Sequence, residues 1–202
     1  MDTKGYRPFS QDLQTWLKSR GPKTLLSLDS VFAEKGFAVT LTLLMAIAAL
    51  PVPTGGLTHI FGFISIIIAI QVLIGRRNLW IPKRWRGLKI SPAMRTKLLP
   101  ALIRLVRWLE KYSRPRMASA LQSQLGIRFY GLIVFVFSVF VTLSPPFSGL
   151  DTLPAMGVVF TSLAIILEDF YLFLVGIIVG SVGVCLTLFL GVAAFELFYR
   201  ML

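Results

Sequence analysis

The chain has 202 residues, of which 55% are hydrophobic and only 15% are charged, and its mean hydropathy is +0.76. A soluble domain carries about 25% charged residues, so this composition excludes an ordinary water-soluble domain and indicates a membrane protein. The net charge of +12 is concentrated, because residues 76–128 hold 14 of the 21 basic residues and only one acid. These charges lie between apolar segments without a nucleic-acid-binding motif, so we expect anionic lipid rather than nucleic acid as the partner.

Residues 1–35 predict a cytoplasmic amphipathic arm. Leu13, Trp16 and Leu17 lie at helical spacing, and Gly21-Pro22 ends this short helix. The arm is polar up to the first apolar run at residue 36, which is not typical of a signal peptide. It either packs on the membrane helices or binds a partner.

Residues 36–75 predict a first membrane hairpin. Its first apolar segment, residues 36–50, reaches only about 22 Å and is short of a ~30 Å hydrocarbon core, whereas residues 57–75 are nearly long enough. Between the two lies a turn that we call the first proline elbow, in which prolines fix φ and glycines permit the chain to reverse. Its defining residues are Pro51, Pro53, Gly55 and Gly56.

Residues 76–127 predict a basic segment on the cytoplasmic side. Ser91-Pro92 is a typical helix start, and the leucines and bases that follow have helical period. We therefore expect a basic amphipathic helix over residues 91–111 in the membrane interface, kinked near Pro100. The bases expected to face lipid or a partner are Arg76, Arg77, Lys83, Arg84, Arg95, Arg104 and Arg107.

Residues 128–169 predict a second membrane hairpin, and residues 170–202 a C-terminal membrane helix. The second hairpin has short apolar segments at 129–144 and 153–167, joined by a second proline elbow with Pro145, Pro146 and Gly149. The last apolar run is either one long tilted helix or a full span plus a shorter piece. Its small residues Gly176 and Gly180 suit close helix packing, so we expect a homodimer there, the alternative being a helix of the same chain.

The two hairpins resemble each other, since each places an elbow between two apolar helices. The fold class predicted is an all-α, polytopic membrane helical bundle with two repeated helix–proline elbow–helix units and a long C-terminal membrane helix. Segments interrupted by proline and glycine at corresponding places in two halves are typical of a transporter-like core. The elbows either dip into the protein or are ordinary polar turns outside the membrane. Because basic residues crowd residues 76–127, this segment and the N-terminus should be cytoplasmic, with both elbows on the opposite side.

Polar groups in or beside the apolar segments are the candidate substrate-binding residues, because each destabilises a membrane helix unless it is partnered. They are Gln71, His59, Asp151, Glu168 and Asp169. The alternative for each is ordinary hydrogen bonding, or pairing with the basic segment for the two late acids. One cysteine and one histidine cannot build a disulfide or a metal cluster, and the glycine-rich loops and nucleophile motifs of enzymes are missing. We therefore expect no catalytic residue, no metal and no cofactor.

The block from Gln71 to Pro82, QVLIGRRNLWIP, resembles the exopolysaccharide-synthesis ExoD family of bacterial inner-membrane proteins, with its Gln, Gly-Arg and Trp-hydrophobic-Pro pattern. The first proline elbow and the Glu168-Asp169 pair match in placement, although Phe170 stands where the family usually has glycine. The similarity covers roughly residues 30–195. It implies a multi-pass inner-membrane protein with a part in exopolysaccharide production or export. Two roles follow: a transporter-like or lipid-handling protein, or a non-transporting scaffold or regulator whose basic helix binds anionic lipid or the polysaccharide-synthesis machinery.

Overall fold

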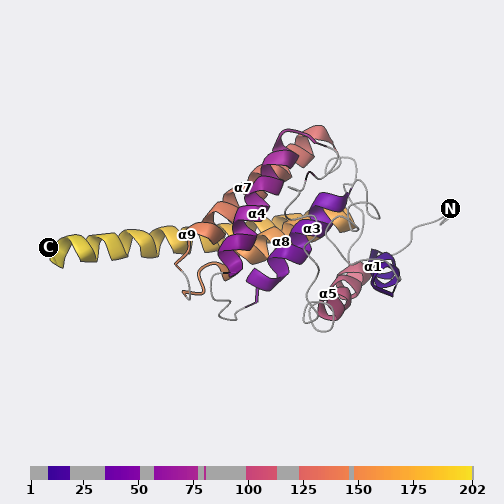
Figure 1. Cartoon of the computed structure of the whole chain (residues 1–202), viewed down its shortest axis with the longest axis horizontal. Coiled ribbons are helices and arrows are strands. Elements are labelled where there is room, and N and C mark those ends of the chain that lie inside the picture. Colours follow the sequence, from indigo (N-terminus) through magenta and orange to yellow (C-terminus); the bar gives the residue numbers. More distant parts are fainter. Residues whose placement is uncertain are drawn as a thin grey trace.

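The computed structural model describes residues 9–18, 35–50, 57–76, 80, 99–112, 123–145 and 148–201. These residues form seven helices and no strand, which confirms the expected all-α class. Five apolar helices form a bundle, and two further helices pair at one end of it (Figure 1). The bundle helices are α3 (Gly36–Ala48), α4 (Leu57–Leu73), α7 (Gln124–Leu143), α8 (Thr152–Leu167) and α9 (Phe170–Met201), and the paired helices are α1 (Phe9–Lys18) and α5 (Leu99–Tyr112).

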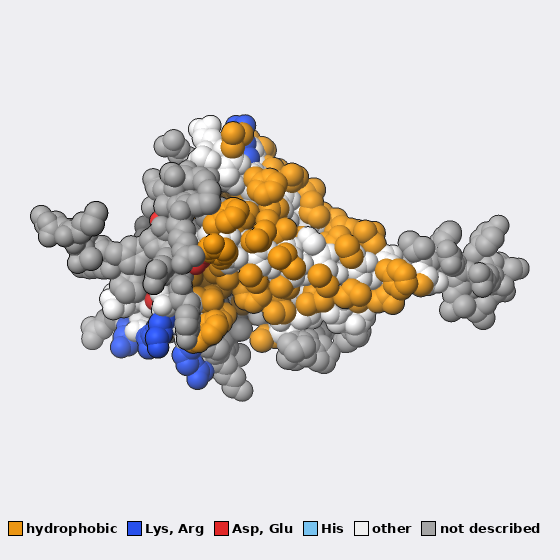
Figure 2. All heavy atoms as spheres, turned by 180° about the vertical axis from the view of Figure 1, so that it is seen from behind, with side chains coloured by type: hydrophobic (Ala, Val, Ile, Leu, Met, Phe, Trp, Pro, Cys, Tyr) orange, Lys and Arg blue, Asp and Glu red, His pale blue; other side chains and the backbone are white. Residues whose placement is uncertain are grey.

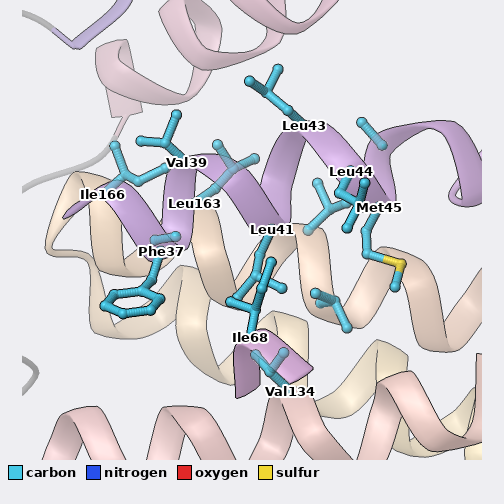
Figure 3. Packing of buried hydrophobic residues seen from close by; sticks show 14 of the residues in the cluster. Phe37, Val39, Leu41, Leu43, Leu44, Met45, Ile68, Val134, Leu163 and Ile166 are labelled. Atoms are coloured by element: carbon cyan, nitrogen blue, oxygen red, sulfur yellow. The ribbon is translucent and has the colours of Figure 1, made fainter. Parts of the chain in front are cut away.

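α3 and α8 form the inside of the bundle. Nearly every residue of α3 and most residues of α8 are buried, and α3 packs against both α8 and α4. Leu41 of α3, Ile68 of α4 and Val134 of α7 meet in the core, as Figure 3 shows. α3 and α8 have only 13 and 16 residues.

α4, α7 and α9 surround this centre and present large apolar side chains outward. Two helical stretches, Gln124–Leu143 and Phe170–Gly191, are long and apolar enough to cross a membrane. α9 is one continuous helix of 32 residues, which decides between the two alternatives for the last apolar run. α7 begins earlier than the expected residue 129, because the Ser123 hydroxyl accepts a hydrogen bond from the Gly126 amide at 3.0 Å and caps the helix.

The basic amphipathic helix is α5, and its described part begins at Leu99. Residues 91–98, with Ser91-Pro92, lie outside the described residues. The kink expected near Pro100 therefore stays a prediction, because the residues before Leu99 are not described.

Candidate functional site

Gln71, in the last turn of α4, holds the chain that follows this helix. Its side-chain oxygen accepts from the Trp80 amide at 2.7 Å, and its side-chain nitrogen donates to the Trp80 carbonyl at 3.0 Å and the Ile67 carbonyl at 3.2 Å. An amide side chain carries both a donor and an acceptor, so it can pair with one backbone residue as another backbone residue would. Gly75 has a φ of +80°, a value that favours glycine, and it turns the chain back toward Gln71. The buried Gln71 amide is therefore occupied by backbone groups.

His59 connects the two proline elbows. It lies in the first turn of α4, and its Nε2 is 3.0 Å from the carbonyl oxygen of Ser144, which ends α7 directly before the second elbow. A carbonyl only accepts, so Nε2 carries the proton and donates. The contact brings the start of α4 and the end of α7 together. His59 Nδ1 is buried and has no hydrogen-bond partner in the described part of the chain.

The elbows themselves are described only in part. Residues 51–56, with Pro51, Pro53, Gly55 and Gly56, lie outside the described residues, as does Pro146. In the second elbow, the Ser148 amide and hydroxyl both donate to the Pro145 carbonyl, at 3.2 and 2.7 Å. Gly149 has a φ of +70° and leads into α8.

Glu168 and Lys35 close the opposite end of the bundle. The Lys35 ammonium donates to Glu168 Oε1 at 2.7 Å and to the Ile166 carbonyl at 2.8 Å. A lysine at this place satisfies a carbonyl at the C-terminus of α8 and complements the helix dipole. Glu168 has a φ of +58° and ends α8 in the left-handed conformation. One partner of Glu168 is thus Lys35, the base at the start of α3.

Asp169 and Asp151 both precede a helix but have different roles. The Asp169 carboxylate accepts from the amides of Tyr171 and Leu172 at 2.9 and 3.3 Å, so it caps α9, and the residue is 8% exposed. Asp151 stands directly before α8, where its side chain makes no capping hydrogen bond. Of the five candidate residues, Asp151 is therefore the one for which the structure records no side-chain partner.

The bases of α5 form an exposed face, because α1 covers the opposite side of this helix. Ile103 and Val106 are buried where α5 contacts α1. On the other side Arg104, Arg107 and Lys111 are exposed, and Trp108 is 59% exposed beside them. We call these four side chains the basic face of α5. Part of the apolar stripe expected to lie in a membrane interface is thus packed on another helix. Arg76 is also exposed, whereas Arg77, Lys83, Arg84 and Arg95 lie outside the described residues.

Gly176 and Gly180 of α9 pack inside the chain. A Cβ atom at Gly176 would lie 2.7 Å from the Thr161 backbone nitrogen of α8, and one at Gly180 would overlap the Phe137 ring of α7. Gly180 itself lies against Gly157 of α8, since a Cβ on Gly157 would lie 2.6 Å from the Gly180 Cα. Packing of these glycines against helices of the same chain is the alternative that the sequence analysis gave to a dimer contact. The homodimer stays an expectation, and it would have to use another face of the molecule.

A family model described as "Exopolysaccharide synthesis, ExoD" matches residues 9–189 of the chain. The chain belongs to the ExoD family. The chain is 30% identical over 193 residues to an uncharacterized protein of Synechocystis sp., a match that covers 94% of this chain and 87% of that protein. It is 31% identical over 150 residues to Protein ExoD of Rhizobium meliloti, covering 72% of this chain and 61% of ExoD. No solved structure matches.

In this ExoD-family chain, two contacts join residues that the sequence did not link. The Ser10 amide and hydroxyl donate to the two oxygens of the Glu110 carboxylate at 2.9 and 2.6 Å, which fixes α1 on α5. The hydroxyls of Tyr130 and Ser162 lie 2.7 Å apart and join α7 to α8. The first contact had a visible signal, because Glu110 is the one acid within residues 76–128. The sequence held no signal for the second contact apart from the presence of the two hydroxyl groups.

Proposed function

We propose that this ExoD-family protein is a multi-pass inner-membrane scaffold for exopolysaccharide synthesis, held on anionic lipid headgroups by the basic face of α5. The observation that carries the proposal is the pairing of α1 with α5. Because α1 covers the apolar side of α5, the side left open carries three bases and a tryptophan. Bases attract an anionic leaflet, and tryptophan favours the headgroup level of a bilayer.

Insertion of the bundle into a membrane is supported by the outward faces of α4, α7 and α9. Figure 2 shows a broad apolar belt on one side of the bundle, with lysines and arginines gathered toward one end of it. Phe63 of α4, Phe129 of α7 and Phe189 of α9 are 55%, 53% and 73% exposed. Soluble monomers rarely expose contiguous apolar patches larger than a few hundred Å², so lipid is the environment that suits this belt.

The orientation follows from the charges at the two ends of the belt. Arg76 follows the end of α4 and Arg128 lies near the start of α7, and these helix ends are opposite to the His59–Ser144 contact. Bases favour the cytoplasmic side. Reporter fusions after residues 54, 90, 148 and 202 test this topology. We expect a cytoplasmic signal after residue 90 and external signals after the other three. An external signal after residue 90 would contradict the orientation.

The lipid interaction is tested with the full-length protein in lipid nanodiscs. Hydrogen–deuterium exchange of residues 99–112 is compared between phosphatidylcholine alone and phosphatidylcholine with phosphatidylglycerol. We expect slower exchange with the anionic lipid, because each base near such a surface contributes about 1 kcal/mol. The triple variant Arg104→Gln, Arg107→Gln, Lys111→Gln should lose this difference. Lys18→Gln on α1, an exposed base outside the basic face, is the matched control and should retain it.

The alternative partner gives a different result. If the triple variant lowers exopolysaccharide yield in cells while the exchange of residues 99–112 is insensitive to anionic lipid, the basic face binds an acidic protein of the synthesis machinery instead. If the triple variant changes neither quantity, the basic face has no role in this function and the scaffold proposal is wrong.

A transporter-like or lipid-handling core is the second candidate, and one observation favours it. Thr40, Ser65 and Ser138 are fully buried in the bundle, and their hydroxyl oxygens have no hydrogen-bond partner within the described part of the chain. Unpartnered polar groups inside an apolar bundle are the kind of group from which a polar path is built. A transporter must expose such a path to water in at least one of its states.

A further inference from the structure

Contacts along α4 and α7 define which positions of these two antiparallel helices face each other. His59 meets Ser144 at the elbow end, and at the other end a Cβ on Gly131 would lie 3.0 Å from the Leu73 backbone nitrogen. Ser65 follows His59 by as many residues as Ser138 precedes Ser144. At ~1.5 Å per residue, both serines therefore lie at the same depth, roughly 9 Å from the elbow end.

The two serines differ from most hydroxyl groups of the apolar helices and share their state with Thr40 of α3. Both are fully buried, and neither side-chain oxygen has a hydrogen-bond partner in the described part of the chain. Other hydroxyls in these helices bond to a carbonyl one turn earlier, as do those of Thr42, Thr142, Thr161 and Thr187. The same local bond is what a hydroxyl in a membrane helix normally makes. Its absence at facing positions of two helices distinguishes this interface.

The unpartnered groups are confined to the elbow-side half of the interface. His59 Nδ1 is the third buried group without a partner there. Between His59 and Ser65, a Cβ on Gly62 would overlap the Thr142 hydroxyl, so the two helices are in close contact at this level. Toward the basic end the interface is apolar, with Ile68, Ala69 and Val72 of α4 and Val134 of α7 all buried. One half of the interface is thus polar and closed, and the other half is an ordinary hydrophobic contact.

We propose that the elbow-side half of the α4–α7 interface is a gate that opens to water as far as Ser65 and Ser138. In the closed state seen here, buried polar groups lack partners, which is unfavourable in apolar surroundings. Separation of the elbow ends supplies those partners as water. The His59–Ser144 hydrogen bond holds the gate closed, and the apolar half of the interface stays packed as the fixed end. This inference rests on the membrane orientation proposed above, which the reporter fusions test separately, and not on lipid binding by α5.

Cysteine labelling tests the gate in the full-length protein. In a Cys185→Ala background, Ser65→Cys and Ser138→Cys each introduce one near-isosteric thiol. Ala69→Cys and Val134→Cys are the controls, since both positions are completely buried one turn further toward the basic end. Intact cells are treated with a charged methanethiosulfonate that does not cross the membrane. We expect labelling at both serine positions at least about tenfold faster than at the controls, as for positions exposed in a minor open state.

A second pair of variants tests the role of His59. His59→Phe removes the hydrogen bond to Ser144 and should increase labelling of both cysteines several-fold, whereas His59→Gln keeps a donor and should change it less. Size-exclusion profiles in detergent verify that each variant is folded. The proposal is overturned if Ser65→Cys and Ser138→Cys react at the control rate with and without His59→Phe. It is also overturned if all four positions react alike, or if inverted vesicles show entry from the cytoplasmic face.

Discussion

Gly180→Ala probes how tightly α9 is packed against the rest of the bundle. A Cβ at this position would overlap the Phe137 ring, lying 2.7 Å from its Cδ2 atom, and the ring is itself enclosed at 4% exposure. Overpacking of this kind destabilises by about 1–3 kcal/mol. Alanine recovers up to about 1 kcal/mol through its better helix propensity. With the full gain subtracted, the expected net loss is up to about 2 kcal/mol.

Two other glycines of the same helix provide the comparison. Gly176→Ala should be more harmful than Gly180→Ala, because its Cβ would lie 2.7 Å from the Thr161 backbone nitrogen and a backbone cannot rotate away. Gly191 has no atom within 4 Å of such a Cβ, so Gly191→Ala should be neutral or stabilising by up to about 1 kcal/mol. SDS titration of the purified protein in mild detergent measures all three free energies of unfolding. The second-site change Phe137→Leu should partly restore Gly180→Ala.

The reasoning fails if Gly180→Ala unfolds at the same SDS concentration as the unmodified protein. The result also separates internal packing from the expected homodimer. If the unmodified protein is dimeric across a dilution series and Gly180→Ala yields a stable folded monomer, Gly180 lies between two copies. If stability falls without a change in association state, the contact is internal.

Three further changes test the helix ends. Gln71→Leu should destabilise by about 1–3 kcal/mol, because it removes two hydrogen bonds to the Trp80 backbone that contribute about 0.5–1.5 kcal/mol each. Thermal unfolding in detergent measures this loss, and Gln71→Glu retains the acceptor. Lys35→Met and Glu168→Gln in a double-mutant cycle should give a coupling of about 1 kcal/mol or less, since the lysine side chain is 32% exposed. Asp169→Ala should remove about 1 kcal/mol of capping energy, whereas Asp151→Ala, without a capping bond, should change unfolding little.

Proline and glycine made much of the helix order predictable. They separate the apolar runs, so α3 and α4 lie within the expected segments, and α8 begins one residue before its expected segment. The continuity of α9 was not predictable, because an apolar run of this length has the same composition whether or not it bends. The start of α7 was missed because Ser123 and the polar residues after it do not belong to the apolar run, although they extend the helix by more than one turn.

The sequence identified notable polar residues, but it did not indicate which groups would form hydrogen bonds with them. A glutamine in an apolar helix identified Gln71 as notable, but no pattern indicates that a loop residue, Trp80, will present both its amide and its carbonyl to it. The amphipathic pattern of α5 likewise predicts which side of the helix is apolar, but it does not predict which element covers that side. That element was α1, and the specific contact is made by Glu110, which composition alone presents as an exception in a basic segment.

The Ser10–Glu110 contact can form only after more than half of the chain has been synthesised. The two residues are 100 positions apart, so α1 leaves the ribosome long before its partner exists. At roughly 5–20 residues per second, the delay is about 5–20 s. During that interval Leu13, which is 1% exposed in the finished protein, has nothing in α5 to pack against. The α3–α4 hairpin is translated within the same interval, so both of its helices are complete before the N-terminal helix can dock.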